Sequence, residues 1–241
     1  MSASIWSRIA WRNVWRNRKR TAITVGALAV GFVSSTVMIG LSEGIIAQMI
    51  ENGTQLVTGE IQVYQDGFKP ERSLYTTLGG RDGADVGDLL ARVRGHMGVR
   101  AAAPRVYAGG LMSSGDETTA GLLLGVDPLL EPGVSRILDG LDQGRFPQPG
   151  SNEVLLGSEM AQKLRVDVGA EVVLVAPAAD GSLGNDVFTV SGTFRTGAAE
   201  LDGAYGILDI ATLQALVALS PGRIHEIAVS VEDSWAAAAI A

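Results

Sequence analysis

A group of basic residues stands directly before a long stretch that carries no charge. Residues 21–42 contain 22 consecutive uncharged residues, and a helix with a rise of about 1.5 Å per residue would make this stretch about 33 Å long. That length matches the hydrocarbon core of a bilayer, about 30 Å. A cleaved secretory signal has a shorter apolar region, of about 7–15 residues. The sequence therefore favours a retained transmembrane helix over residues 21–42, rather than a cleaved signal or a buried helix of a soluble core.

Charge is distributed very unevenly along the chain. The first twenty residues contain six basic and no acidic side chains, whereas the rest of the chain contains 13 basic and 26 acidic ones. The positive-inside rule predicts a single span with a cytoplasmic N-terminus and the main domain on the other side of the membrane. An acidic domain repels phosphate backbones, so nucleic acid is excluded as its partner.

The segment before the span, residues 1–20, has the pattern of a basic amphipathic helix. Arginines recur every fourth residue and form one ridge, while tryptophans occupy much of the remaining surface. Such a helix would lie along the cytoplasmic membrane surface, with its tryptophans at headgroup depth. The alternative is a basic flank that only fixes topology. The predicted membrane-surface residues are Trp6, Arg8, Trp11, Arg12, Trp15 and Arg16.

Small residues recur at helical spacing inside the predicted span. Ala27, Gly31 and Ser35 are four residues apart, which places them along one strip of the helix and lets a second helix approach closely. The strip predicts a helix-packing surface, although small residues can also face lipid.

After the span, the helical pattern continues as a stalk, residues 43–58, before Gly59 interrupts it. The segment "EIQVYQ" then predicts a strand, residues 85–98 a helix that ends at Gly98 with Met97 on its apolar face, and two strands follow around the turn at residues 114–117. The strand "IHEIAVSVED" comes near the C-terminus, and "SWAAAAIA" opens another helix. We expect residues 59–138 and 221–241 to form one βαβ-rich lobe.

A Gly- and Pro-rich passage over residues 139–150 predicts a boundary, beyond which strands dominate. The segment "SEMAQKLRV" predicts a short helix capped by Ser158, and "IATLQALVAL" predicts a second helix. Residues 139–220 are expected to form a β-rich lobe, so that the whole domain is α+β. Its strands are predicted in "NEVLLG", "AEVVLVAP", "DVFTVSGTFRT" and "AYGILDI".

The sequence contains no motif of an active site. It has no GxxxxGK[ST] or HExxH segment, no GxSxG nucleophile elbow at a strand-to-helix turn, and no cysteine. His96 and His225 have no ligand spacing around them and are interpreted as surface or packed histidines, while Glu200 and Asp202 are interpreted as solvated or turn-forming carboxylates. We therefore predict that the chain is not an enzyme and has no catalytic, cofactor-binding or metal-binding residues.

Four segments together resemble one family of membrane proteins. They are "IAWRNVWRNRKRTAITVGALAVG", "GEIQVY", "NEVLLGSEMAQKLRVDVGAEVVLV" and "FTVSGTFRTGAAELDGAYGILDIATLQAL". Their order and spacing resemble the permease subunits of FtsX-like, or MacB/LolC/LolE-type, ABC transporters, and "GTFRTGAAELDGAY" is the most specific piece. The resemblance implies a periplasmic core domain after the first transmembrane helix, in the bacterial inner membrane, and assigns Gly197, Glu200 and Asp202 to a loop between lobes or toward a partner.

The same resemblance implies partners. These are a separate ABC ATPase that uses ATP and Mg²⁺, a second permease subunit in a homo- or heterodimer, the lipid membrane, and a lipoprotein or periplasmic protein. Two departures bear on this expectation. The three C-terminal helices of such permeases are absent, so a fragment is expected, and the loop over residues 177–185 is short where lipoprotein-releasing permeases carry a longer one.

Two functions remain as hypotheses. The first is a permease subunit that couples ATP hydrolysis by its partner to extraction or export of a lipoprotein or other amphiphilic cargo. The second is an FtsX-like signalling or scaffold subunit whose external domain binds and regulates a protein without transport. An apolar cavity open to lipid would favour cargo, and a flat patch with a polar rim would favour a protein partner.

Overall fold

The structure is a computed structural model that describes residues 11–12, 16–53, 59–69, 73–80, 85–135 and 137–232. Side chains are described in these ranges except at residues 43–53 and 138. The chain divides into two compact units, residues 1–52 and 53–241, and each is described by itself.

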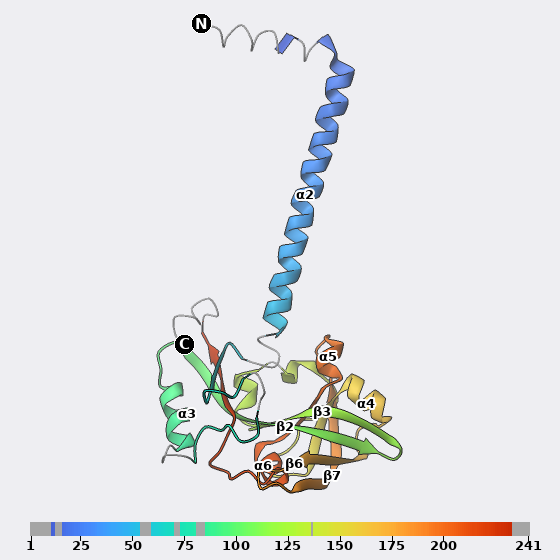
Figure 1. Ribbon diagram of the computed structural model, residues 1–241. Coiled ribbons are helices and arrows are strands. Elements are labelled where there is room, and N and C mark those ends of the chain that lie inside the picture. Colours follow the sequence, from blue (N-terminus) through green and yellow to red (C-terminus); the bar gives the residue numbers. More distant parts are fainter. Residues whose placement is uncertain are drawn as a thin grey trace. The chain divides into compact units, whose positions relative to one another are not determined.

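The first unit is dominated by one long helix, α2 (Arg18–Gly53), shown in Figure 1. It contains the whole of the predicted span, and its stretch Arg18–Ser42 is long and apolar enough to cross a membrane. The helix continues through the predicted stalk as far as Gly53. Of the predicted N-terminal helix, residues 11, 12 and 16 are helical, and residues 1–10 and 13–15 lie outside the described part.

The second unit is built on a nine-stranded mixed sheet in the order β1-β9-β2-β3-β8-β5-β7-β4, with β6 pairing to β2 and β7. β2 and β3 form a long antiparallel hairpin at its centre (Figure 1). β3–β8 and β5–β7 are parallel pairs. The strands are β1 (Ile61–Tyr64), β2 (Val99–Ser114), β3 (Glu117–Val126), β4 (Leu141–Gly144), β5 (Glu153–Gly157), β6 (Glu171–Pro177), β7 (Leu183–Phe194), β8 (Tyr205–Asp209) and β9 (Glu226–Val231).

The order β1-α3-β2-β3 confirms the predicted β-α-β-β arrangement, and the strands predicted beyond residue 150 are all present. The lobe boundaries at residues 139 and 221 stay predictions, and the predicted helix at 234–241 lies outside the described residues. The helices of this unit are α3 (Val86–Arg94), α4 (Ser158–Leu164), α5 (Ala199–Asp202) and α6 (Ile210–Leu216), with 3₁₀ turns η2 (Glu131–Gly133) and η3 (Ile137–Gly140).

Two local predictions are wrong. α3 ends at Arg94 because Gly95 caps it, so Met97 lies beyond the helix and is 90% exposed. Ser158 is the first residue of α4 rather than its cap; Gly157 occupies the cap position and supplies no side-chain hydrogen bond. The passage over residues 139–150, predicted to mark a boundary, contains the last two residues of η3 and the strand β4.

Apolar side chains lie on both faces of the central hairpin. On one face, Val106 and Met112 of β2 pack with side chains of α4 and α6 in the main core. On the other face, Tyr107 packs with Phe68 and Phe194 in a second cluster. β2 is therefore covered on both sides along much of its length, which explains why its sequence alternates poorly between polar and apolar residues.

Candidate functional site

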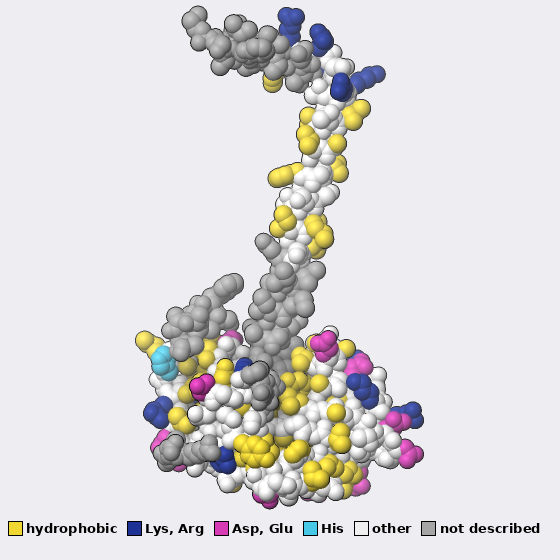
Figure 2. All heavy atoms as spheres, in the orientation of Figure 1, with side chains coloured by type: hydrophobic (Ala, Val, Ile, Leu, Met, Phe, Trp, Pro, Cys, Tyr) yellow, Lys and Arg dark blue, Asp and Glu magenta, His cyan; other side chains and the backbone are white. Residues whose placement is uncertain are grey.

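The surface of α2 is uncharged and exposed all round over residues 22–42. Every described side chain from Ala22 to Ser42 is exposed, and Figure 2 shows hydrophobic side chains along this part of the helix, with basic ones at its N-terminal end. The Oγ1 atoms of Thr24 and Thr36 donate to carbonyls one turn earlier, at 3.0 and 2.9 Å. Hydroxyls satisfied within the helix are what an apolar solvent requires.

The predicted packing strip lies on this exposed surface. Ala27, Gly31 and Ser35 are all exposed, and a Cβ added at Gly31 would meet no atom of the described structure within 4 Å. The strip is thus open to a partner helix, and its packing role stays a prediction. Among the predicted membrane-surface residues, Trp11, Arg12 and Arg16 are helical and exposed, whereas Trp6, Arg8 and Trp15 lie outside the described residues.

The residues of the predicted partner loop have different roles in the fold. Gly197 has φ +85°, a backbone conformation that glycine adopts readily. The carboxylate of Asp202, 3% exposed, accepts bonds of 2.7 Å from both the backbone N–H and the hydroxyl of Thr196. Glu200 is exposed on the short helix α5. Asp202 therefore closes the loop from inside, and Glu200 faces solvent.

α5 also packs closely on the start of α4. A Cβ added at Gly157 would lie 2.1 Å from the carbonyl oxygen of Asp202, so only glycine allows the two backbones to approach this closely. The loop at residues 196–203 is consequently held between the end of β7 and α4. Of the two predicted alternatives for Asp202, solvated or turn-forming, the structure shows the turn-forming one.

A buried ionic cluster was missed by the sequence interpretation. Arg105 of β2 is 0% exposed, and its Nε atom donates to Glu131 Oε2 at 3.3 Å while a second nitrogen binds Glu131 Oε1. Its Nη1 atom lies 3.6 Å from Oε1 of Glu226 on β9. The hydroxyls of Ser135 and Tyr107 donate to Glu131 and Glu226 at 2.7 and 3.2 Å.

The charges of this cluster stabilise one another. Burial by itself lowers the pKa of the Arg105 guanidinium, but the adjacent negative charge of Glu131, with smaller contributions from Tyr107 and Glu226, raises that pKa above its ordinary value. The cluster fixes the turn η2 against the central strand. A charged residue inside the otherwise uncharged strand segment "AAAPRVYAGG" is the signal that could have revealed it.

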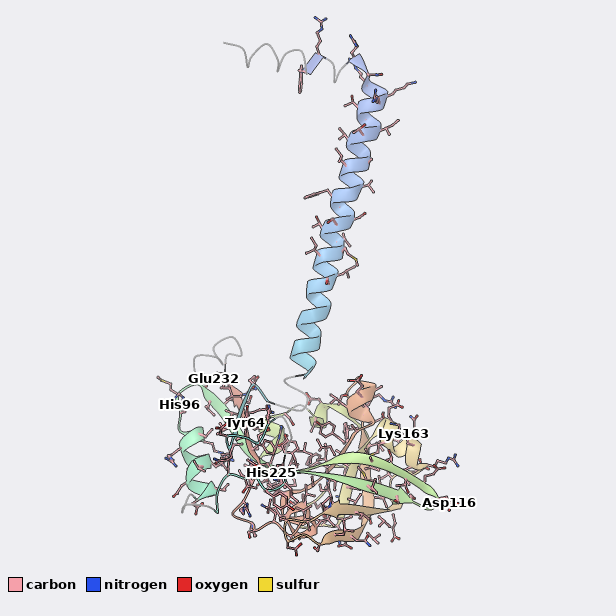
Figure 3. The ribbon with its side chains drawn as sticks, in the orientation of Figure 1. Tyr64, His96, Asp116, Lys163, His225 and Glu232 are labelled. Atoms are coloured by element: carbon pink, nitrogen blue, oxygen red, sulfur yellow. The ribbon has the colours of Figure 1, made fainter. Side chains whose placement is uncertain are left out.

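His225 borders this cluster and is packed as the sequence predicts. Its Nδ1 atom accepts the backbone N–H of Tyr107 at 3.0 Å, its Nε2 atom lies 3.1 Å from the carbonyl of Leu74, and its ring stacks on Phe68 at 5.4 Å. Figure 3 places it inside the domain, whereas His96 lies at the periphery. Burial lowers the pKa of His225, and the charge of Arg223 lowers it further. Among the described residues, no group of three or more His, Cys, Asp or Glu side chains could hold a metal ion.

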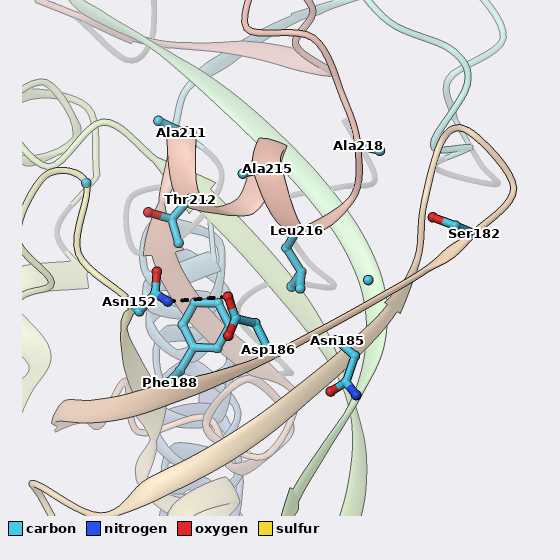
Figure 4. Close-up of a pocket in the computed structure, with 12 residues that line it drawn as sticks. Asn152, Ser182, Asn185, Asp186, Phe188, Ala211, Thr212, Ala215, Leu216 and Ala218 are labelled. Carbon is cyan, nitrogen blue, oxygen red and sulfur yellow. Dashed lines mark hydrogen bonds between the residues drawn. The ribbon is translucent and has the colours of Figure 1, made fainter.

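Two hollows of similar size, and a smaller one of about 340 Å³ beside α4, open on the described part of the second unit. One, of about 530 Å³, lies between α3 and β1 and is lined mainly by apolar side chains such as Ile61, Val93 and Val229. The other, of about 590 Å³, lies between α6 and the first half of β7, with Asn152 and Asp186 on its wall (Figure 4). Both are open surface hollows rather than enclosed chambers, so neither has the water-excluding shape typical of an active site.

The sequence matches the family described as MacB-like periplasmic core domain over residues 21–241. The lipoprotein-releasing system transmembrane protein LolC of Neisseria meningitidis serogroup B (strain ATCC BAA-335 / MC58) is 28% identical over 139 residues, or 55% of this chain and 34% of that protein. LolC of Xylella fastidiosa (strain Temecula1 / ATCC 700964) is 31% identical over 126 residues, or 49% of this chain and 30% of that protein. The chain thus covers about a third of the length of these curated relatives.

The fold is also found in a solved structure. The extracellular domain of the noncanonic ABC-type transporter YknZ from Gram-positive bacteria superposes with a TM-score of 0.50 at 13% identity, covering 74% of this chain and 86% of that one. This likeness concerns the fold alone. The predicted α+β fold with an N-terminal apolar helix and the predicted resemblance are both confirmed. The chain belongs to the MacB-like periplasmic core domain family.

Proposed function

We propose that this chain is the N-terminal part of an ABC transporter permease subunit of the bacterial inner membrane. The observation that carries the proposal is the family match over residues 21–241, joined to a membrane-length helix whose apolar side chains are exposed throughout residues 22–42. A separate ATPase, using ATP and Mg²⁺, would supply the energy. The cargo would be a lipoprotein or another amphiphile, as the names of the LolC relatives suggest.

The mechanism in this proposal is mechanical. The strip of Ala27, Gly31 and Ser35 would pack against helices of the same or a second permease subunit. Because α2 runs without a break from Arg18 to Gly53, a tilt imposed inside the bilayer would be carried past the membrane surface by the same rigid element. The loop closed by Asp202 would then present Glu200 to a partner.

The orientation can be tested directly because the chain contains no cysteine. A single Leu129→Cys variant, at a position that is 81% exposed in the second unit, should react with a membrane-impermeant maleimide on intact spheroplasts. A matched Arg12→Cys variant should react only after lysis, because the proposal places it in the cytoplasm. The opposite labelling pattern would reverse the topology.

The function is tested by co-purification. The full reading frame that contains this chain is expressed with its neighbouring genes and purified through a tag on the permease. A stoichiometric ATPase whose activity rises with added lipoprotein or amphiphile is the expected result. An ATPase without cargo stimulation, but with a bound extracytoplasmic protein, would replace the proposal by the signalling or scaffold function. No ATPase at all would overturn both.

A further inference from the structure

One edge of β7 is open over its first half. Along its other edge β7 pairs with β6 from Leu183 to Thr189, whereas pairing with β5 begins only at Thr189. The described part of the chain therefore contains no strand beside residues 183–188 on the β5 side. An open strand edge offers unpaired N–H and C=O groups in a row and is a template for a further strand.

The direction of the backbone groups along this edge follows from the recorded bonds. The N–H of Thr189 donates to the carbonyl of Asn152 at 3.0 Å, while the N–H of Val190 donates toward the opposite side, to Ala170 at 2.9 Å. Because direction alternates along a strand, the backbone groups of Asn185 and Val187 point to the open edge. The N–H of Val187 accordingly finds the carboxylate of its neighbour Asp186, at 2.8 Å, rather than a strand.

A hollow lies directly beneath this edge. It has a volume of about 590 Å³, and its far wall is formed by the exposed Ala211 and Ala215 of α6 and by Ala218 just beyond that helix, which leave room for another side chain (Figure 4). At one end the hollow is closed where β7 meets α6: a Cβ at Gly184 would lie 1.9 Å from the carbonyl oxygen of Leu216. The open edge from there to residue 188 measures about 13 Å at about 3.3 Å per residue.

The chemistry of the hollow specifies its occupant. Asp186 is the one ionisable side chain among the residues that line it, and the remaining polar groups are amides and hydroxyls; half of the lining is apolar. Asp186 is already tied to Asn152, whose Nδ2 atom donates to it at 3.3 Å. A strand added at the edge would point alternate side chains into the hollow, one beside Asp186 and one against the alanines of α6.

We infer that the edge of β7 at residues 183–188, with the hollow below it, binds an extended peptide segment of another protein by strand addition. The inward side chains of that segment are a basic residue at Asp186 and a small apolar residue at Ala215. This inference rests on the proposed function in one respect only: the proposed topology decides in which compartment the second unit would encounter the peptide. The site itself needs neither an ATPase nor a cargo.

Binding is measured with the full chain in detergent and a dye-labelled peptide of sequence Thr-Val-Thr-Lys-Thr. The expected affinity is weak, with a Kd on the order of 0.1–1 mM for so short a peptide. Hydrogen exchange should slow at the backbone amides of Asn185 and Val187 when the peptide is bound. Absence of binding at 10 mM peptide, roughly tenfold above the weakest expected Kd, or protection at other amides alone, would overturn the inference.

Matched variants locate the site. Ala215→Phe fills the hollow from an exposed position and should weaken binding about tenfold or more, whereas Ala91→Phe, the same change on the exposed side of α3, should leave it unchanged. Asp186→Asn should weaken binding roughly two- to fivefold, and the loss should shrink in salt. Equal affinities of the Ala215→Phe and Ala91→Phe chains would contradict the assignment.

Other occupants are excluded by competition. If laurate displaces the peptide, the hollow binds acyl chains; if the apparent Kd for the peptide rises as the chain concentration is raised and the chain self-associates, the edge pairs with a second copy. Either result overturns the inference. A peptide in which the lysine is replaced by glutamate should bind more weakly, and equal binding would contradict the role of Asp186. All these measurements omit the ATPase, so their failure leaves the transporter proposal standing.

Discussion

The two units of this chain place their side chains in opposite ways. α2 turns apolar side chains such as Phe32 and Leu28 outward, whereas the second unit encloses charged side chains, with Arg105, Glu131 and Glu226 each at most 1% exposed. In water both arrangements are unfavourable, because exposing apolar surface to water and burying a charge each raise the free energy of the folded chain. Each unit therefore fits a different environment: the exposed side chains of α2 fit surrounding lipid, and the buried charges of the second unit are satisfied by an internal network.

Charges introduced into α2 are expected to have the largest effect, because they oppose its placement in lipid. Val30→Arg combined with Val33→Arg introduces two charges near the middle of the span, at about 2.5–3.5 kcal/mol each, or about 5–7 kcal/mol together. The chain should then be extracted from membranes by alkaline carbonate. Leu129→Arg, at an exposed position of the second unit, should remain in the membrane fraction. If the double variant also remains there, α2 is not held by lipid.

Removal of one charge from the buried cluster is expected to have the next largest effect. Arg105→Met leaves Glu131 and Glu226 buried without their cation, and should lower the free energy of unfolding by about 3–5 kcal/mol. Arg145→Met breaks the ion pair with Glu153 at the surface and should cost at most about 1 kcal/mol. Denaturant unfolding of the purified chain in detergent measures both.

The combined variant Arg105→Met with Glu131→Gln sharpens the result. Because it removes a positive and a negative charge together, it should recover part of the stability that Arg105→Met loses. If Arg105→Met destabilises the chain no more than Arg145→Met does, the cluster makes no special contribution, and the contrast between buried and surface charge is wrong.

The loop at residues 196–203 offers the same contrast on a smaller scale. Asp202→Ala removes the buried Oδ1 atom that accepts both hydrogen bonds of Thr196 and should lower stability by about 1–3 kcal/mol. Glu200→Ala, at an exposed position of the same short helix, should change stability by less than about 0.5 kcal/mol. Thermal unfolding compares the two, and equal shifts would show that the loop is not closed by Asp202.

Local patterns were sufficient for most elements of the fold. The span, the β2–β3 hairpin and α6 follow from uncharged length, turn residues and helical periodicity, each of which is legible within a short window. The end of α3 was missed because Gly95 competes with Gly98 as a stop, and an apolar Met97 suggested a longer apolar face. A short stretch of sequence shows which residues could end a helix, but not which of them does.

The candidate sites depended on longer-range information. Arg105 meets Glu131 and Glu226, which lie 26 and 121 positions away in the sequence, so only the assembled sheet brings them together. The open edge of β7 depends on where β5 begins to pair, at Thr189, and this register is a property of two strands rather than of one. By contrast, the strip around Gly31 was predictable, because it lies within a single helix.

A pH titration tests the enclosed side of the comparison. His225 is buried and its pKa is lowered, so below the unfolded value of about 6.5 the unfolded chain binds a proton that the folded chain does not. Stability should therefore fall as the pH decreases below about 6.5, by up to about 1.4 kcal/mol per pH unit until the lowered pKa is reached.

The contribution of His225 is isolated by substitution. His225→Gln should flatten this pH dependence, and His96→Gln, at an exposed position, should leave it as it is. Denaturant unfolding between pH 5 and pH 8 gives the slopes. An unchanged slope in His225→Gln would mean that other groups set the pH dependence of this fold.

Helix packing by α2 should have the smallest effect and completes the contrast. Gly31→Leu adds a bulky side chain to the strip that we expect to face a partner helix, at a cost on the order of 1 kcal/mol to association. Gly40→Leu adds the same group nine residues later, on the opposite side of the helix at about 100° per residue. A Cβ added at either glycine would meet no neighbouring atom within 4 Å, so both substitutions should affect the folding of α2 equally.

Recovery of partner subunits with the full-length permease should drop for Gly31→Leu alone. Equal recovery would mean that the strip around Gly31 contacts lipid rather than a partner helix, so that the exposed surface of α2 is not an assembly interface.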